Sequence, residues 1–116
     1  MWKLKKDGSL EGVRGDSGRL VLTMRTGGKT GPTVDLTGCT VKAQVRSAPN
    51  AYPIFDWVPD YSEMANGKII LDVDKSVTAA INKVDGFHDI QLTWPSGRVQ
   101  TIVYPSPVTI IKDITL

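Results

Sequence analysis

The chain has 116 residues, of which 41% are hydrophobic and 22% are charged, a composition typical of a folded domain and not of a disordered segment. Its formal net charge of +2 is too small to indicate a nucleic-acid partner, and its single cysteine, Cys39, excludes an intrachain disulfide. No apolar run approaches the roughly 20 residues that a membrane-spanning helix needs, and the opening residues lack the pattern of a secretory leader. We therefore expect a chain that is made in a cytoplasm and does not associate with a membrane.

The N-terminal part of the chain is mildly basic. Residues 1–30 hold seven Lys and Arg against three Asp and Glu, whereas residues 31–116 hold seven against nine. Residues 1–14 show little hydrophobic periodicity, so we predict a basic arm there and a single folded domain over residues 15–116. Such an arm could become ordered on a neighbouring subunit during assembly.

Alternation of apolar and polar residues begins near residue 18 and recurs along the chain. It runs through residues 18–26, 39–47, 67–74 and 87–94, and the segment around Ile54–Val58 has the composition of one more short strand. In residues 39–47, for example, Val41, Ala43 and Val45 alternate with polar or charged residues. A period of two is typical of strands that bury one face.

The segments between these strands carry turn residues. Residues 25–33 are dense in glycine, and the sequence TWPSGRV at 93–99 predicts a hairpin with Gly97 in a left-handed conformation. Because Pro105 and Pro107 cannot donate hydrogen bonds to a neighbouring strand, residues 104–111 are predicted to lie at a sheet edge or a crossover.

One segment has helical spacing instead. Residues 74–84 place Val77, Ala80 and Ile81 on one face, with Asp74 or Ser76 as the N-cap and Gly86 just beyond the end. This spacing predicts a short helical crossover between strands. About seven short strands with one such crossover are typical of an immunoglobulin-like antiparallel β-sandwich, and we predict this all-β fold.

The sequence RGDSG at residues 14–18 contains both an adhesion tripeptide and the GDSG of serine proteases. A nucleophilic serine needs a histidine base and an orienting acid, but the single histidine, His88, lies in a predicted strand far from Ser17. The RGD tripeptide needs an exposed loop of an extracellular protein, which nothing in this sequence indicates. We interpret the motif as a turn into the first strand and predict no enzymatic activity.

No other motif indicates a cofactor or a metal. The sequence GGKT at 27–30 lacks the first glycine of a phosphate-binding loop, because Thr23 stands at that position and no helical pattern follows. Metal sites need clustered ligands, whereas Cys39 and His88 are single and Asp72 and Asp74 only flank the start of the helical segment. We expect no catalytic residue, no metal ligand and no cofactor.

Aromatic and outward-facing apolar residues indicate a binding surface. Aromatic residues and carboxylates are interleaved in residues 52–61, which suits a protein interface, stacking on sugars, or a cap over one end of the core. Ile70 should face the opposite side of its strand from Ile69 and Leu71, and Ile110 and Ile111 occupy both faces of the last strand. Strands that are apolar on both faces are covered on both faces, so we expect a neighbouring subunit to cover the outward one. The candidate interface residues, including those of the basic arm, are Trp2, Lys5, Lys6, Tyr52, Phe55, Trp57, Tyr61, Ile70 and Ile111.

Five pieces of the sequence also form an ordered pattern that spans most of residues 13–116. They are Gly15–Ser17, Val34–Gly38, Gly67–Leu71, Gly86–Thr93 and Gly97–Ile102. In this order they resemble small β-sandwich structural proteins of tailed bacteriophages and prophages, similar to the N-terminal domain of phage upper baseplate proteins. The resemblance implies a non-enzymatic virion module, present in multiple copies in a tail, baseplate or neck.

We therefore predict a virion structural protein, synthesised in the bacterial host cytoplasm, that binds other virion proteins and copies of itself but not nucleic acid. A capsid decoration protein is the alternative within the same class. A carbohydrate-binding module, which would contact host surface glycans through Tyr52, Trp57 and Tyr61, is the alternative from another class.

Overall fold

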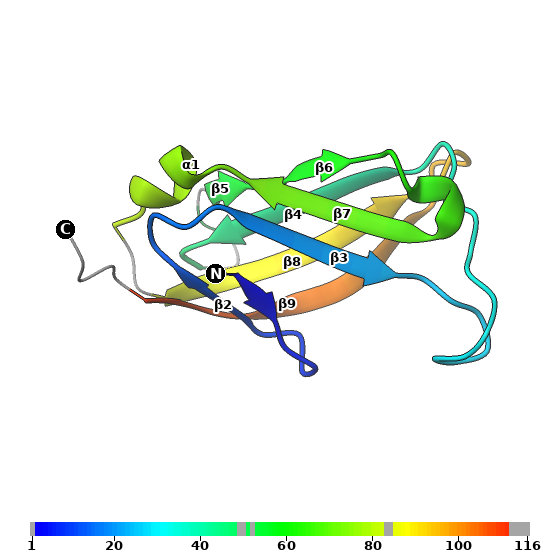
Figure 1. The fold of residues 1–116 in the computed structure, drawn as a ribbon, viewed down its shortest axis with the longest axis horizontal. Helices are drawn as coiled ribbons and strands as arrows, with labels where there is room; N and C mark the ends of the chain where they lie inside the picture. The colour runs from blue at the N-terminus through cyan, green and yellow to red at the C-terminus, as the bar shows by residue number, and fades with distance from the viewer. Residues whose placement is uncertain (1, 49–50, 52, 83–84, 112–116) are drawn as a thin grey trace.

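The computed structural model describes residues 2–48, 51, 53–82 and 85–111, which form two β-sheets (Figure 1). The larger sheet has six strands in the order β1-β2-β9-β8-β4-β5, and the smaller sheet has three in the order β3-β7-β6. A short 3-10 helix, Met64–Asn66, precedes β7, and the helix α1, Lys75–Ala79, follows it. The strands are β1 Lys3–Leu4, β2 Leu10–Val13, β3 Gly18–Thr23, β4 Thr40–Arg46, β5 Pro53–Asp56, β6 Val58–Asp60, β7 Lys68–Val73, β8 Asp85–Thr93 and β9 Val99–Ile111.

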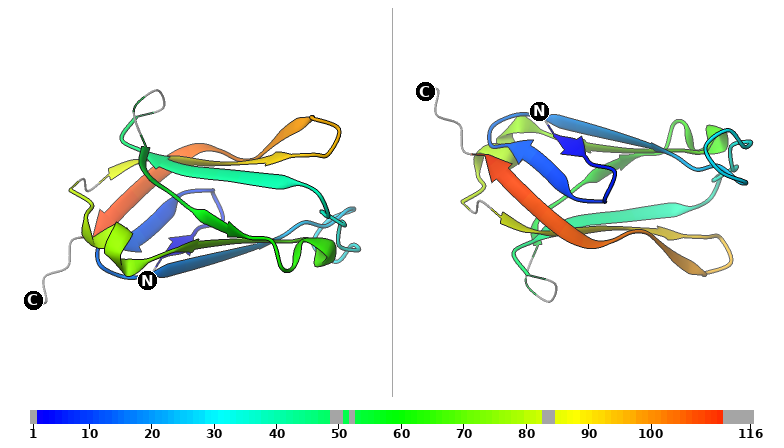
Figure 2. Two further views of the ribbon diagram at one scale, coloured as in Figure 1. Left: turned by 90° about the horizontal axis from the view of Figure 1, so that it is seen from above. Right: turned by 90° about the horizontal axis from the view of Figure 1, so that it is seen from below.

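The strand order is that of an immunoglobulin-like β-sandwich, as the sequence predicted. Strands β9, β8, β4 and β5 follow the order of the G, F, C and C′ strands of such domains, and β3, β7 and β6 follow B, E and D. Strand β2 runs parallel to the end of β9, whereas the other described strand pairs are antiparallel. Figure 2 shows the two sheets edge-on as separate layers, with α1 at one end.

The core lies between the two layers and follows the predicted alternation. Val41, Ala43 and Val45 of β4 are buried, and Ile69 and Leu71 of β7 are fully enclosed. Full burial of one such side chain contributes about 1.5–3 kcal/mol of transfer free energy. The inward face of each of these strands is therefore set by its sequence pattern.

The N-terminal residues differ from the predicted basic arm. They form β1 and β2, which join the larger sheet beside β9, and Trp2 is only 5% exposed. Gly12 and Gly18 make room for the indole, because a Cβ at either position would lie within 3 Å of its ring atoms. Trp2 and Leu10 supply most of the buried apolar surface of this segment, and because they are eight residues apart the sequence shows little periodicity.

The segment 74–84 contains a shorter helix than the sequence predicted. Asp74 is the N-cap, as expected, and its carboxylate accepts a hydrogen bond of 3.1 Å from the backbone N–H of Ser76. The helix ends at Ala79, and Gly86 is not a helix stop but a buried residue of β8, where a Cβ would clash with the carbonyl oxygen of Arg46. The described helices are too short to cross a membrane.

Residues 53–60 form two strands in place of the single one expected. β5 pairs with β4 in the larger sheet, and β6 pairs with β7 in the smaller one. The chain therefore crosses between the layers at Trp57, whose backbone N–H donates to the carbonyl of Ala43 at 2.9 Å.

The C-terminal part of the chain confirms the predicted hairpin, but only the proline stretch of residues 104–111 lies at an edge, because Val108 and Thr109 pair with both β2 and β8. The turn after β8 is closed by Gly97 N–H, which donates to Trp94 at 2.8 Å, and Gly97 has a φ of +90°. Pro105 and Pro107 lie in β9 on the stretch that pairs only with β8, since the pairing with β2 begins at Val108. The prolines are thus at a sheet edge, where a missing N–H leaves no ladder bond unmade.

Candidate functional site

The aromatic residues that the sequence assigned to an interface are mostly in the core. The rings of Trp2, Phe55 and Trp57 meet edge-to-face with centroid distances of 5.4–5.9 Å. Trp2, Phe55 and Trp57 are 5%, 6% and 3% exposed, respectively. They therefore offer no ring face to a sugar or a protein partner, and the prediction that they form part of a surface is wrong.

The other predicted interface residues lie apart from one another. Lys5 and Lys6 are exposed in the turn between β1 and β2, and Lys5 forms an ion pair of 3.3 Å with Glu11. Ile111 is 46% exposed at the end of β9, and Tyr61 is 47% exposed after β6. Tyr52 lies outside the described residues. The structure does not bring these side chains into one site.

Ile70 faces outward from the smaller sheet, as its parity predicted, yet it is only 6% exposed. Its cross-strand neighbours are Val21 and Asp60. On the same face Arg19 contacts Asp72 at 2.7 Å and Asp60 at 3.5 Å. Ile70 is therefore buried within the chain itself, so the prediction of Ile70 as a partner contact is wrong.

The RGDSG sequence forms a turn that fastens α1 to the start of β3. Gly15 has a φ of +91°, and its N–H donates to the hydroxyl of Thr78 at 3.1 Å. The Thr78 hydroxyl donates to the carbonyl of Asp16 at 2.8 Å, and the indole N–H of Trp2 donates to the same carbonyl at 3.1 Å. The motif thus has a structural role here.

His88 cannot serve Ser17 as a base. It belongs to the larger sheet, is 2% exposed, and its Nε2 lies 2.6 Å from the carbonyl oxygen of Gly8, whereas Ser17 is exposed at the start of the smaller sheet. Nε2 therefore carries the proton and Nδ1 lacks a hydrogen-bond partner. Burial lowers the pKa of His88 because the charged form would lose its hydration. Within the described part of the chain, no group of three or more His, Cys, Asp or Glu could hold a metal ion.

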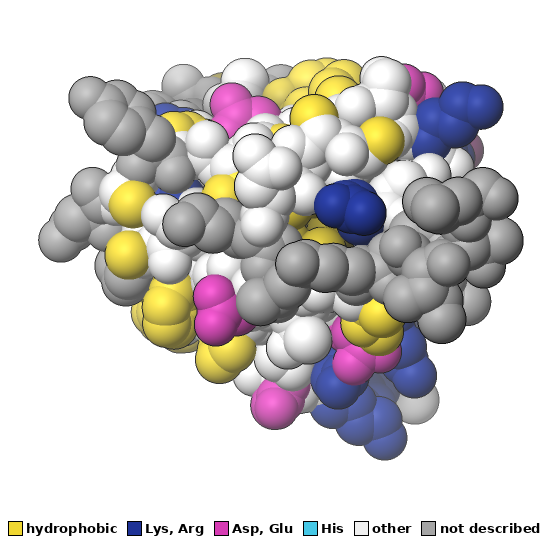
Figure 3. All heavy atoms as spheres, turned by 90° about the vertical axis from the view of Figure 1, so that its left-hand side faces the viewer, with side chains coloured by type: hydrophobic (Ala, Val, Ile, Leu, Met, Phe, Trp, Pro, Cys, Tyr) yellow, Lys and Arg dark blue, Asp and Glu magenta, His cyan; other side chains and the backbone are white. Residues whose placement is uncertain are grey.

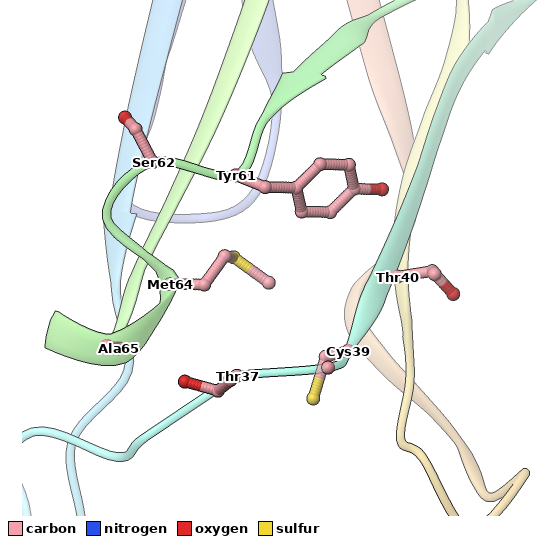
Figure 4. Close-up of a pocket in the computed structure, with 8 residues that line it drawn as sticks. Thr37, Cys39, Thr40, Tyr61, Ser62, Met64 and Ala65 are labelled. Atoms are coloured by element: carbon pink, nitrogen blue, oxygen red, sulfur yellow. The ribbon is translucent and has the colours of Figure 1, made fainter.

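An open hollow of about 460 Å³ lies at the end of the sandwich beside β4 (Figure 4). It is lined by Thr37, Gly38, Cys39, Thr40, Tyr61, Ser62, Met64 and Ala65. The ring of Tyr61 reaches across it, and its hydroxyl accepts a hydrogen bond of 3.1 Å from the backbone N–H of Val41. Burial raises the pKa of the Cys39 thiol, which keeps it protonated and unreactive. With no charged lining residue, the hollow offers no acid or base.

The larger sheet carries an apolar surface of which the sequence interpretation found only Ile111. The exposed large hydrophobic residues of the described chain are Val21, Val58, Tyr61, Val77, Phe87, Val99, Tyr104 and Ile111. The last four belong to β8 and β9, and Phe87 lies directly opposite the exposed Pro107 in the ladder. By contrast, Figure 3 shows hydrophobic groups scattered among polar and charged ones at the end of the sandwich that carries α1.

We call the outward side of β8 and β9, with the flanking strands of the same sheet, the outer face of the larger sheet. The alternation in residues 87–94 could have shown that Phe87 faces outward, because Phe87 alternates with the inward-facing His88, Ile90 and Leu92. In β9 such a signal existed for Ile111 but not for Val99 or Tyr104. Two register shifts between β8 and β9 break the alternation, so only the ladder shows which residues face outward.

No family model and no curated protein sequence matches this chain significantly. A comparison of folds finds a structure of murine CRIg, at 11% sequence identity and a TM-score of 0.42, with 97% of each chain covered. At this level of similarity the neighbour carries no argument about function. The immunoglobulin-like fold therefore rests on the strand order itself.

Proposed function

We propose that this chain is a non-enzymatic structural module of a tailed phage or prophage virion, where it acts in multiple copies through protein–protein contacts. Its place would be a tail, baseplate or neck. The proposal joins two independent supports, a surface suited to protein contact and the ordered sequence pattern described above.

The observation that carries the proposal is the apolar character of the outer face of the larger sheet. Phe87 is 37% exposed, Val99 is 58% exposed and Tyr104 is 74% exposed. Exposed aromatic and aliphatic side chains grouped on one face favour association with another protein, because their burial removes apolar area from water. The hollow beside β4 and the isolated His88 supply no comparable support for catalysis.

The sequence pattern supports the virion setting. Its glycines lie where a side chain is disfavoured: Gly15, Gly38, Gly67 and Gly97 have φ values between +76° and +91°, which strain residues with a Cβ, and a Cβ on Gly86 would clash. The pattern thus describes the turns of a scaffold. This agrees with a family whose members share a structural role.

Mass spectrometry of purified particles tests the proposal. The particles would come from the host strain that encodes the chain, after prophage induction, and we expect the chain to be present together with tail or baseplate proteins. A Phe87→Glu variant that folds normally should be depleted from particles. Absence of the native chain from intact particles would refute the proposal.

A further inference from the structure

We infer that His88 makes the N-terminal hairpin an acid-sensitive latch, which stays closed at neutral pH and opens more often as the pH falls. The hairpin consists of β1, β2 and the turn between them, together with Trp2. The inference goes beyond the proposed function and does not depend on it. It follows from the way in which the hairpin turn covers a buried histidine ring whose second nitrogen has no partner.

The turn between β1 and β2 lies directly against the His88 ring. Nε2 of His88 donates to the carbonyl oxygen of Gly8, with 2.6 Å between the two atoms. Gly8 also packs on Ser106, the ladder partner of His88 in β9, since a Cβ on Gly8 would lie 3.0 Å from the Ser106 hydroxyl oxygen. The hairpin therefore covers the ring, and the ring in turn holds the hairpin turn through a hydrogen bond.

The closed hairpin leaves the ring no place for a second proton. His88 is only 2% exposed, and its Nδ1 is buried without a hydrogen-bond partner among the described residues. An imidazolium at this position would keep the bond to Gly8 but would carry a second N–H group that nothing accepts. Protonation therefore favours a state in which water reaches the ring.

The charged groups around the ring do not replace the missing partner. Asp89, the next residue of β8, favours the charged form of His88, but burial acts more strongly and lowers the pKa of the ring. On β4, the guanidinium of Arg46 binds groups of its own strand and of the following loop. On β9, the ladder partner Ser106 does not titrate. The charged side chains of the hairpin turn are exposed, namely Lys5, Lys6 and Asp7.

The hairpin is a covering element that can open while the rest of the sandwich stays folded. β2 joins the larger sheet by parallel pairing of Leu10–Val13 with Val108–Ile111, and parallel pairing is slightly less stable per residue than antiparallel pairing. Strands β3 to β9 supply two sheets without the hairpin. Burial of Trp2 and Leu10 opposes opening and keeps the latch closed at neutral pH.

The histidine sets how strongly acid favours the open hairpin. In the open state the ring is hydrated and titrates near pH 6.5, whereas the closed state holds it neutral. Protonation then multiplies the ratio of open to closed hairpin by about 1.1 at pH 7.5 and by about 11 at pH 5.5. The stabilisation of the closed latch is thus present above pH 6.5 and is lost as the pH falls below it.

Native-state hydrogen exchange, measured by NMR at pH 7.5 and pH 5.5, tests the inference. We expect the hydrogen-bonded amides of β2 to be less protected than those of β4 at both pH values, because the hairpin opens before the sandwich unfolds. The protection factors of β2, corrected for the intrinsic exchange rate, should fall about tenfold between the two pH values. Equal protection of β2 and β4, or an unchanged protection of β2, would overturn the inference.

A His88→Gln variant is the matched control, because a glutamine amide can donate to Gly8 but does not titrate. We expect the protection of β2 in this variant to be the same at both pH values. A tenfold fall in the variant would assign the pH dependence to another group and would overturn the role of His88. Circular dichroism shows whether the variant folds, and the comparison of β2 with β4 in the native chain tests the latch without it. Neither result bears on the virion role, which the composition of the particles tests.

Discussion

Thr78 joins three parts of the chain through one buried hydroxyl group. The side chain is fully buried, accepts from the N–H of Gly15 and contacts the carbonyl oxygens of Asp16 and Lys75 at 2.8 Å and 3.2 Å. Buried backbone groups need such partners, since an unpaired one costs about 1–3 kcal/mol. The RGDSG turn and α1 therefore depend on each other.

Replacement of Thr78 by Val should destabilise the protein by about 1–3 kcal/mol, because it keeps the volume but leaves the backbone N–H of Gly15 without its partner. Thr78→Ser retains the hydroxyl and should lose less. Urea unfolding followed by tryptophan fluorescence measures the free energy of unfolding of both variants. Equal losses for Val and Ser would contradict a hydrogen-bonding role.

Ser17→Ala is the matching surface substitution within the same motif. Ser17 is exposed, and we assign it no catalytic role, so the free energy of unfolding should change by less than about 0.5 kcal/mol and assembly should persist. A loss of association in this variant would contradict the structural interpretation of RGDSG.

His88 should make the stability depend on pH. Burial holds the ring neutral in the folded state, where Nδ1 has no hydrogen-bond partner, so the pKa of His88 is lowered relative to the unfolded chain although the Nε2 bond to Gly8 acts in the opposite direction. The unfolded state therefore binds a proton first, near pH 6.5, and the stabilisation present above that pH is lost as the pH falls below it. Unfolding at pH 7.5 and 5.5 measures the difference. A His88→Gln variant should lose this pH dependence, which is assignable because the chain has one histidine.

At the scale of the element, the N-terminal hairpin closes the side of the sandwich. β2 extends the larger sheet by parallel pairing with β9, while Trp2 fills the space between Gly12 and Gly18 and meets Phe55 and Trp57. Residues from both ends of the chain thus share one core. The hairpin is part of the folded unit.

A methyl group at Gly12 should disturb this arrangement. In a Gly12→Ala variant the new Cβ would lie 2.1 Å from Trp2 Cε3, so the indole must shift, and overpacking of this kind costs about 1–3 kcal/mol. Lys3→Ala, on the exposed strand beside it, is the control and should have little effect. Thermal unfolding of the two variants compares them, and equal melting temperatures would show that Trp2 does not need the space.

At the scale of the whole molecule, the two outer faces differ in how they meet water. On the smaller sheet Arg19 pairs with Asp72 and Asp60, whereas β8 and β9 of the larger sheet carry the exposed Phe87, Val99 and Tyr104. This asymmetry explains why only one face is proposed to bind a partner.

Cys39 reports on the integrity of the whole sandwich. It is 4% exposed, and burial raises its thiol pKa, so a disulfide reagent should react only when the end of the sandwich opens. We expect slow labelling in buffer and fast labelling in urea, with a rate that follows the fraction unfolded. Thr78→Val should accelerate labelling in proportion to its loss of stability. Rapid labelling of the native chain would contradict the burial of Cys39.

The sequence by itself determined the strands whose alternation is regular, the Asp74 cap and the Gly97 hairpin, because these depend on neighbouring residues alone. Only the tertiary structure decided which of the large side chains are buried and which are exposed. Trp2 and Trp57 share a core because strands distant in sequence meet there, and Ile70 is buried although it faces outward from the smaller sheet. The outer face of β9 also needed the structure, since its register shifts move side chains between faces without changing the sequence pattern.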